Sequence, residues 1–254
     1  MADFVTYQKH PTKGYGLITL NRSNKRNAIS LQMAESFRLC LQQAKDDNLK
    51  CLVVTGAGER MFCAGGDLKE LHGELTIHDA EVNLKKMMQV LYEIAVFPMP
   101  TIALLNGDAL GGGCELATAC DIRIAKEKTR FGFVQTNLGI IPGWGGGVLL
   151  TKKVHPSFSY QWIMEGNLYD AQELETKGWI HRVVREQEWE SIDKLIEPYW
   201  SKSVKQLELL KEQYLEAIGV IGLHDFMMNE VERCASLWDS DAHKNAVAAF
   251  LSRH

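Results

Sequence analysis

The stretch Asp108–Asp121, "DALGGGCELATACD", decides how the rest of the sequence is interpreted. Three glycines at 111–113 stand at the start of a run of good helix formers, and a carboxylate follows at Glu115. Adjacent glycines lose much conformational entropy on folding, so three in a row are expected where bare backbone must approach something closely. The apolar segment 101–107, "TIALLNG", precedes them. We therefore predict a buried strand, a glycine turn and a helix.

Composition and charge exclude several classes of protein. The 254 residues are 46% hydrophobic, and 28 Lys and Arg stand against 32 Asp and Glu, a net charge of −4 that argues against a nucleic-acid-binding surface. No apolar run approaches the roughly 18–20 residues of a membrane span. The opening "MADFVTYQKH" alternates like a strand and does not resemble a signal peptide. The six cysteines form no CxxC pair, which favours buried free thiols and a cytoplasmic location.

Hydrophobic periodicity predicts alternating strands and helices followed by a helical end. The pattern predicts no strand after about Gln187, so we expect an α/β core over residues 1–190 and a helical region over 191–254. The sequence shows no internal repeat. Strands are predicted at 4–10 and 15–22 as a hairpin, and at 51–58, 101–107, 121–125 and 180–184; helices are predicted after the cap Ser30, at 76–94 and at 170–178.

A second glycine cluster repeats the arrangement of the first. The segment 56–70, "GAGERMFCAGGDLKE", also reads as a strand, a glycine turn and a helix start, whereas the third cluster, 141–147, follows no strong strand. Neither of the first two fits GxxxxGK[ST], and neither fits GxGxxG. Each helix start can point a backbone N–H at one place, and the helix dipole adds positive potential there. Two converging N–H groups are what an oxyanion hole requires.

Several motifs together resemble one family. The segments "FCAGGDLKEL" (62–71), "ALGGGCELATACD" (109–121) and "LGIIPGWGG" (138–146) resemble, in order and spacing, the enoyl-CoA hydratase/isomerase (crotonase) superfamily. The segments 21–30 and 166–184 are similar to its N-terminal signature and its downstream helix–strand segment. The resemblance implies a crotonase-like (ClpP/crotonase) spiral β-sheet core with a C-terminal helical trimerisation region, and a homotrimer or a dimer of trimers.

The same resemblance implies an acyl-CoA thioester as substrate. Its carbonyl oxygen would meet the N–H groups of Gly66 and Gly112, and a side chain within 111–113 would intrude on the thioester. Coenzyme A enters as part of the substrate, so no separate cofactor is implied, and the histidines show no metal-ligand spacing. The positions implied to bind the CoA thioester, besides these two glycines, are Arg26, Ala28, Ala64, Asp67, Leu68 and Trp144.

Glu115 falls on the position of a family catalytic glutamate. The alternative is a glutamate that interacts with the dipole of its own helix, but the surrounding "CELATAC" is otherwise apolar. The second family glutamate is replaced by Gln135. A glutamine cannot take up a proton at neutral pH, and hydration usually shares its proton transfers between two carboxylates. We therefore expect slow hydration, while double-bond isomerisation or decarboxylation needs only one acid.

Three functions stay open at this point. The first is an enoyl-CoA hydratase/isomerase-type enzyme with one retained glutamate. The second is a short-chain alkylmalonyl-CoA decarboxylase, since "FVQTNLGIIPGWGG" (133–146) is similar to the ethylmalonyl-CoA decarboxylase branch. The third is a catalytically weak CoA- or RNA-binding protein on the same fold, and the net negative charge argues against RNA. His72 and Glu74 could face the acyl pocket or lie on a surface helix. Cys114 has no nearby histidine in the sequence, which argues against a nucleophile.

Overall fold

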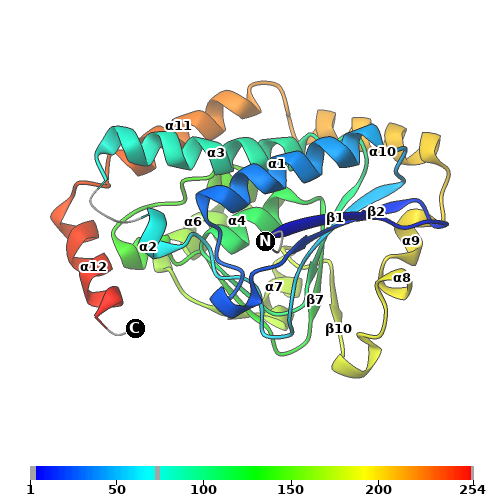
Figure 1. Cartoon of the computed structure of the whole chain (residues 1–254), viewed down its shortest axis with the longest axis horizontal. Helices are drawn as coiled ribbons and strands as arrows, with labels where there is room; N and C mark the ends of the chain where they lie inside the picture. Colours follow the sequence, from blue (N-terminus) through cyan, green and yellow to red (C-terminus); the bar gives the residue numbers. More distant parts are fainter. Residues whose placement is uncertain (1–3, 72–74, 253–254) are drawn as a thin grey trace.

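Two β-sheets with helices packed around them make up the computed structural model, which describes residues 4–71 and 75–252 (Figure 1). The larger sheet has six strands in the order β1-β2-β3-β5-β7-β10, and the smaller has four in the order β4-β6-β8-β9. The strands are β1 Val5–Lys9, β2 Tyr15–Leu20, β3 Cys51–Gly56, β4 Met61–Cys63, β5 Thr101–Leu105, β6 Asp108–Leu110, β7 Ile122–Lys126, β8 Arg130–Gly132, β9 Tyr169–Asp170 and β10 Arg182–Val184.

The larger sheet confirms the predicted hairpin and the predicted buried strands. β1 and β2 pair antiparallel with Val5 opposite Leu20. The other pairs of this sheet are parallel, from β2–β3 through to β7–β10. Every residue of β5 is buried, as expected for a parallel strand covered on both faces.

Three times the chain leaves the larger sheet and enters the smaller one. β3 leads into β4, β5 into β6 and β7 into β8, with the next strand beginning within a few residues of each strand's end. The corners pack closely, because a Cβ on Gly107 would lie 2.3 Å from the backbone of Arg60 and Met61. β4 and β6 are each followed by a glycine turn, so the topology places both turns at one end of the smaller sheet. These three-residue strands were not predicted, because they are too short to show a periodicity.

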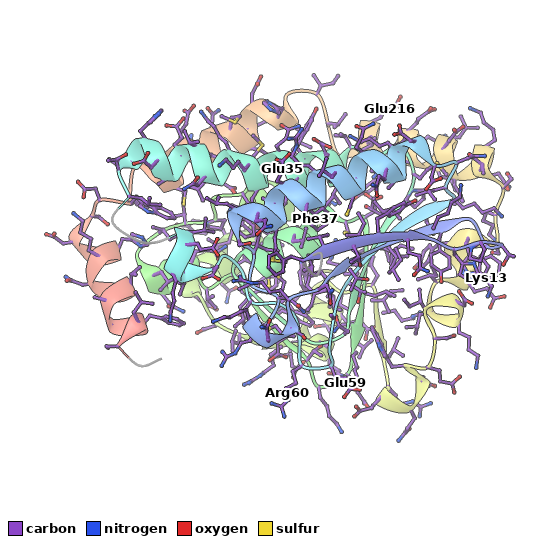
Figure 2. The ribbon with its side chains drawn as sticks, viewed as in Figure 1. Lys13, Glu35, Phe37, Glu59, Arg60 and Glu216 are labelled. Atoms are coloured by element: carbon purple, nitrogen blue, oxygen red, sulfur yellow. The ribbon has the colours of Figure 1, made fainter. Side chains whose placement is uncertain are left out.

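The helices begin where the sequence supplies a cap. The Ser30 side chain accepts a hydrogen bond from the N–H of Met33 at the start of α1, and Thr76 with Asp79 forms a capping box at the start of α3. Phe37 lies on the side of α1 that faces the strands (Figure 2) and is fully buried. The first helices are η1 Ser23–Lys25, α1 Leu31–Asp46, α2 Leu68–Leu71, α3 Ile77–Ala95, α4 Gly112–Ala119, η2 Gln135–Leu138, α5 Gly146–Lys153, α6 Pro156–Glu165 and α7 Ala171–Thr176.

The chain after β10 contains no strand among its described residues, as predicted. α7 ends at Thr176, slightly before the expected end at Gly178. α11 packs along α3, and α12 lies beside η2 on the other side of the molecule from α10 (Figure 1). The division into a core and a helical region at residue 190 stays a prediction. The last helices are η3 Glu186–Glu188, α8 Ile192–Leu195, α9 Glu197–Trp200, α10 Val204–Ala217, α11 Leu223–Ala235 and α12 Asp241–Leu251.

The described helices include none that is both long enough and apolar enough to cross a lipid bilayer.

Candidate active site

The N–H group of Gly66 points away from the strand-like bridge that fixes it. Gly66 forms a parallel bridge with Ile29, in which Ile29 N donates to Gly65 O at 2.8 Å and Asp67 N donates to Ile29 O at 2.8 Å. In a trans peptide the C=O and the N–H point in opposite directions. Because the Gly65 carbonyl faces Ile29, the Gly66 N–H faces the other way. It has no acceptor among the described residues.

Gly112 presents a second N–H group in the same way. It is the first residue of α4, and the preceding Gly111 adopts φ +52°, a conformation that favours glycine. The Gly111 carbonyl accepts hydrogen bonds from Cys114 N at 2.9 Å and Glu115 N at 3.1 Å. The N–H of Gly112 therefore points out of the helix N-terminus, where the helix dipole is positive. It too has no acceptor within the part of the chain that the structure describes.

Each glycine of the triple is required by a different neighbour. A Cβ on Gly113 would lie 2.1 Å from the carbonyl oxygen of Cys63, and a Cβ on Gly112 would lie 2.2 Å from the indole ring of Trp144. Gly111 is required by its backbone conformation. Two protein contacts and one backbone conformation thus require glycine at these positions. That a side chain there would also intrude on a thioester stays a prediction.

Both N–H groups line a cavity of about 220 Å³. The Trp144 indole forms one wall and is 4% exposed. A Cβ on Gly66 would lie 3.5 Å from this ring, so the indole lies against both glycines. The other walls are mainly apolar and include residues that the sequence did not single out: Leu71, Leu84, Leu110, Val134, Leu138, Ile140, Ile141, Cys234, Trp238 and Phe250.

Glu115 is buried in the wall of this cavity, and its carboxylate accepts several hydrogen bonds. Oε2 accepts from Trp144 N at 2.9 Å and from Gly146 N at 3.0 Å. Oε1 accepts from Gln135 Nε2 at 2.8 Å. Burial raises the pKa of Glu115, and the N–H donors of Trp144 and Gly146 oppose this effect. The expectation that Glu115 does not lie on a solvated helix face is confirmed, since it is 2% exposed.

Gln135 lies beside Glu115 at the start of η2 and also lines the cavity. Its Nε2 donates to Glu115, while its Oε1 is buried and has no hydrogen-bond partner among the residues that the structure describes. An unpaired buried acceptor is costly, typically about 1–3 kcal/mol. The amide is therefore placed to accept a hydrogen bond from a group that enters the cavity.

Glu230 is a buried carboxylate that the sequence analysis missed. It projects from α11, and its carboxylate accepts from Val148 N at 2.7 Å and from Gly147 N at 3.3 Å. Burial, and then the nearby charge of Glu115, raise the pKa of Glu230 well above 4.5. A signal was present in the sequence, because Met227, Glu230 and Cys234 share the apolar stripe of one amphipathic helix.

Most of the positions expected to hold CoA line a second cavity that adjoins the first, whereas Gly112 and Trp144 line only the first. Arg26, Ala64, Gly66 and Leu68 border both cavities, and the second has about 370 Å³. Its further lining residues are Arg22, Lys25, Ala28, Asp67, Lys69, Glu70, Phe250 and Leu251. The sequence-predicted residues are thus brought together, although no ligand contact tests them.

Two of these residues have structural partners. The Asp67 carboxylate accepts a hydrogen bond from Arg22 Nη1 at 2.7 Å, so it holds the turn that carries Gly66. Arg26 adopts φ 55° and the next residue, Asn27, φ 53°. Asn27 is fully buried, and its Nδ2 donates to the carbonyls of Ala57 and Met61. This anchor fixes the loop that carries Arg26, and the sequence analysis did not identify it.

Cys114 has no chemical role that the geometry supports. The Cys114 thiol is buried, donates to Ala109 O at 3.0 Å, and has its pKa raised well above 9.0 by burial, which disfavours a nucleophile. His72 and Glu74 lie outside the described residues. All six cysteines are free and buried. Within residues 4–71 and 75–252, no group of three or more His, Cys, Asp and Glu side chains is arranged to hold a metal ion.

Comparisons with known proteins give the same fold and family. The chain matches the family model "Enoyl-CoA hydratase/isomerase" over residues 11–254. The mitochondrial methylglutaconyl-CoA hydratase of Mus musculus is 34% identical over 185 residues, which are 72% of this chain and 58% of that protein. A crystal structure of an enoyl-CoA hydratase from Bacillus anthracis aligns with a TM-score of 0.79 at 30% identity, covering 99% of this chain and 97% of that one.

A second crystal structure is that of an enoyl-CoA hydratase from Mycobacterium avium subsp. paratuberculosis K-10. It aligns with a TM-score of 0.86 at 22% identity and covers 100% of this chain and 98% of that one. At this identity the likeness supports the fold alone. The chain belongs to the enoyl-CoA hydratase/isomerase family and has the crotonase fold, so the resemblance noted in the sequence is confirmed. The matched segment spans 58% of the length of the mouse relative.

The raised pKa of Glu230 predicts a pH-dependent effect on stability. Above about pH 4.5 the folded chain retains a proton on Glu230 that the unfolded chain has lost, so the stability it contributes declines as the pH rises. Glu230→Gln removes this titration and, like the protonated carboxyl, keeps one carbonyl oxygen that can accept from the N–H of Gly147 or of Val148. We expect the melting temperature of Glu230→Gln, relative to wild type, to increase from about pH 5 to about pH 9.

The control is Glu232→Gln, an exposed position on the same helix, whose difference from wild type should stay constant with pH. Thermal unfolding followed by circular dichroism at several pH values measures both variants. A pH-independent difference for Glu230→Gln would contradict the buried protonated carboxyl.

Proposed function

We propose that this protein acts on acyl-CoA thioesters by stabilising a thioester enolate. The observation that carries the proposal is that two N–H groups without an acceptor, those of Gly66 and Gly112, line the same cavity as one buried carboxylate, Glu115. Two such donors match the needs of an enolate oxygen, and each is typically worth about 3 kcal/mol in the transition state. The adjoining cavity around Arg26 has room for part of the CoA moiety.

Glu115 would transfer the proton at the substrate's α or γ carbon. Burial raises its pKa, which keeps part of the population protonated nearer to neutral pH and suits a group that both gives and takes a proton. The donors on its Oε2 hold the carboxylate in one orientation. This restraint favours transfer to a single position in the cavity.

Glu115 is the one carboxylate among the described lining residues of this cavity. Hydration divides its proton transfers between two acids, whereas isomerisation moves one proton between two carbons. We therefore rank isomerase-type chemistry on an enoyl-CoA above hydration within the enoyl-CoA hydratase/isomerase reactions. The mouse relative is named a methylglutaconyl-CoA hydratase, so a methylglutaconyl thioester belongs in the substrate panel with crotonyl- and 3-enoyl-CoA.

A short-chain alkylmalonyl-CoA decarboxylase is the second candidate, and Gln135 favours it. Loss of carbon dioxide leaves its bonding electrons in the enolate, so no base is needed, and Glu115 would then protonate the α carbon. Gln135 is neutral and would not repel the substrate's second carboxylate, as a glutamate there would. The apolar ring of Trp144 would cover the departing group and exclude water.

A third possibility is a weakly catalytic CoA- or RNA-binding protein. A thermal-shift screen with acyl-CoA thioesters and with RNA, combined with assays of thioester turnover, separates it from the first two. A binding protein would be stabilised by one of these ligands without turning over a thioester. The homotrimer or dimer of trimers, the cytoplasmic location and the absence of a separate cofactor stay predictions.

Replacing Glu115 by glutamine tests the acid–base role. The amide keeps the size of the side chain, and rotation of the Gln135 amide can present its unpaired Oε1 to the new donor, so the fold should persist. We expect kcat to decrease by about 10²–10⁴-fold on every substrate that wild type accepts. A decrease smaller than about tenfold would assign Glu115 a structural role only.

Gln135→Glu tests the choice of reaction. It places a second carboxyl within hydrogen-bond distance of Glu115, where Nε2 and Oε1 are now 2.8 Å apart. We expect faster hydration of crotonyl-CoA, because the new carboxylate can take a proton from the attacking water. We expect slower decarboxylation of alkylmalonyl-CoA, because a second anion repels the substrate carboxylate. Both rates are measured at neutral pH. Fast wild-type hydration that the substitution does not improve would show that another group activates water.

Gly112→Val tests the oxyanion hole. A Cβ at this position would lie 2.2 Å from the Trp144 ring, so the valine must displace the indole that lines the cavity beside the Gly112 N–H. We expect a folded protein whose kcat/KM is lower by about 100-fold or more. Trp144→Ala is the matched control, because it removes the ring and leaves both N–H groups; its loss should be at least about tenfold smaller. Equal losses would trace the effect to the indole rather than to the N–H groups.

A further inference from the structure

A separate cavity of about 440 Å³ lies at the opposite end of α4 from the candidate active site. The two cavities share no lining residue among those described, and α4 extends over eight residues, about 12 Å. We call it the basic cavity. Its cationic lining residues are Arg123, Lys152, Lys153, Lys202 and Lys211.

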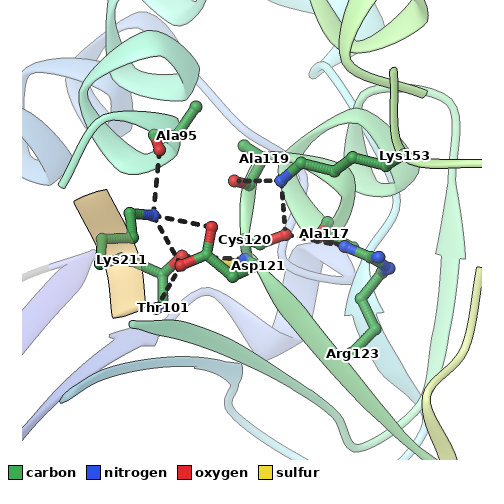
Figure 3. A network of polar contacts seen from close by, with 9 residues as sticks. All are labelled: Ala95, Thr101, Ala117, Ala119, Cys120, Asp121, Arg123, Lys153 and Lys211. Atoms are coloured by element: carbon green, nitrogen blue, oxygen red, sulfur yellow. Dashed lines mark hydrogen bonds and ion pairs between the residues drawn. The ribbon is translucent and has the colours of Figure 1, made fainter. Parts of the chain in front are cut away.

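One carboxylate, Asp121, lies among the described lining residues of the basic cavity, and it is already paired. Lys211 Nζ contacts Asp121 Oδ1 at 2.7 Å and Oδ2 at 2.6 Å, and both side chains are nearly fully buried (Figure 3). Asp121 Oδ2 also accepts from Thr101 N at 2.9 Å. This ion pair joins α10 to the core, and it leaves the other cations of the cavity without a counter-charge.

Within the described chain, the side-chain hydrogen bonds of Arg123, Lys152 and Lys153 all go to carbonyl oxygens. Lys153 Nζ donates to Ala119 O at 3.1 Å and Cys120 O at 2.9 Å, and Arg123 Nη1 donates to Cys120 O at 2.7 Å (Figure 3). Lys152 Nζ donates to carbonyls just after α10. None of these three forms an ion pair within the described chain.

The negative ends of two helices offset only part of the positive charge of these side chains. The carbonyls belong to the C-terminal ends of α4 and α10, and each helix end carries roughly half a negative charge. Two ends therefore offset about one of the positive charges on Arg123, Lys152, Lys153 and Lys202. Burial lowers the pKa of the Lys153 ammonium to about 7, as expected for a cation that lacks an anionic partner. A surplus of positive charge remains at the cavity.

The rest of the lining is apolar or aromatic, apart from His181. Burial lowers the pKa of the His181 imidazole to about 4, so it adds no positive charge at neutral pH. An anion that enters would exchange water for several charge-assisted hydrogen bonds, which are about twice as strong as neutral ones. A short hydrocarbon chain on the same molecule would contact the apolar part of the wall. These residues are Pro100, Ile122, Pro198, Tyr199, Leu207, Leu210, Tyr214 and Ile218.

We propose that the basic cavity binds a small organic oxyanion, a carboxylate or a phosphate monoester with a short apolar chain, at a site separate from the candidate active site. Its oxygens would be held by Lys152, Lys153 and Lys202, and its chain would lie against Tyr199 and Leu210. The proposal does not depend on the reaction proposed above.

Calorimetric titration with hexanoate at neutral pH tests the site in the full-length protein. We expect saturable binding by wild type that weakens about tenfold or more in the double variant Lys152→Gln, Lys202→Gln. Lys202→Glu alone, at an exposed position that cannot disturb the fold, should weaken it as well. Inorganic phosphate and 1-hexanol, which carry only the anion or only the chain, should each bind more weakly than hexanoate.

The matched control is the double variant Lys25→Gln, Arg26→Gln, which removes two cations from the cavity beside the candidate active site. It should bind hexanoate as wild type does. Loss of binding in this control with retention in Lys152→Gln, Lys202→Gln would place hexanoate in the other cavity and overturn the proposal. Equal binding of hexanol and hexanoate, or no binding at about 10 mM hexanoate, would also overturn it.

Discussion

Five backbone N–H groups between Gly143 and Val148 donate to the carboxyl groups of two buried glutamates, Glu115 and Glu230, and much of the site depends on this arrangement. A carboxylate removed from water is destabilised by several kcal/mol unless donors replace the lost hydration. Glu115 accepts hydrogen bonds from residues 143–146 of this turn, and Glu230 accepts them from residues 147 and 148. Because these residues come from α4 and α11, the turn joins two distant segments of the chain around one cavity.

The glycines of this turn follow from the same requirement. A Cβ on Gly146 would lie 2.3 Å from Cβ of Glu115, and a Cβ on Gly147 would lie 2.7 Å from Oε2 of Glu230. Any side chain would separate the N–H groups from the carboxylates that they stabilise. The third glycine cluster follows no strong strand and entered the sequence analysis only as a family motif. In the structure it positions the acid of the proposed reaction.

α4 connects the features that carry function. Its N-terminus presents the N–H of Gly112, its first turn carries Glu115, and its C-terminal carbonyls bind Lys153 and Arg123. Cations at a helix C-terminus and a developing anion at its N-terminus both interact favourably with the helix dipole. The close contact of Gly113 with the carbonyl of Cys63 sets how near the two glycine turns come. The single helix α4 therefore contributes positive potential to the candidate active site at its N-terminus and negative potential to the basic cavity at its C-terminus.

The sequence by itself determined the long elements, because their signals are local. Period-two alternation predicted β1 and β2, and capping residues predicted the starts of α1 and α7. Motif order and spacing were sufficient for the family. The three-residue strands β4, β6 and β8 escaped prediction, since so short a segment carries no periodicity. The sequence shows no repeat, yet the chain passes from the larger sheet to the smaller one three times. The same path can be formed by segments whose residues differ.

The tertiary structure alone decided how the site residues are used. It placed Gln135 against Glu115, assigned Asp67 to Arg22, and brought Glu230 from α11 to the turn at Gly147. It also gathered the cations of the basic cavity from β7, α5, α10 and the segment between α9 and α10, although no cluster of them is visible along the chain. Burial and hydrogen bonding between segments set these contacts and the pKa shifts that follow from them. A linear pattern cannot supply them, because they depend on which distant groups share one small volume from which water is excluded.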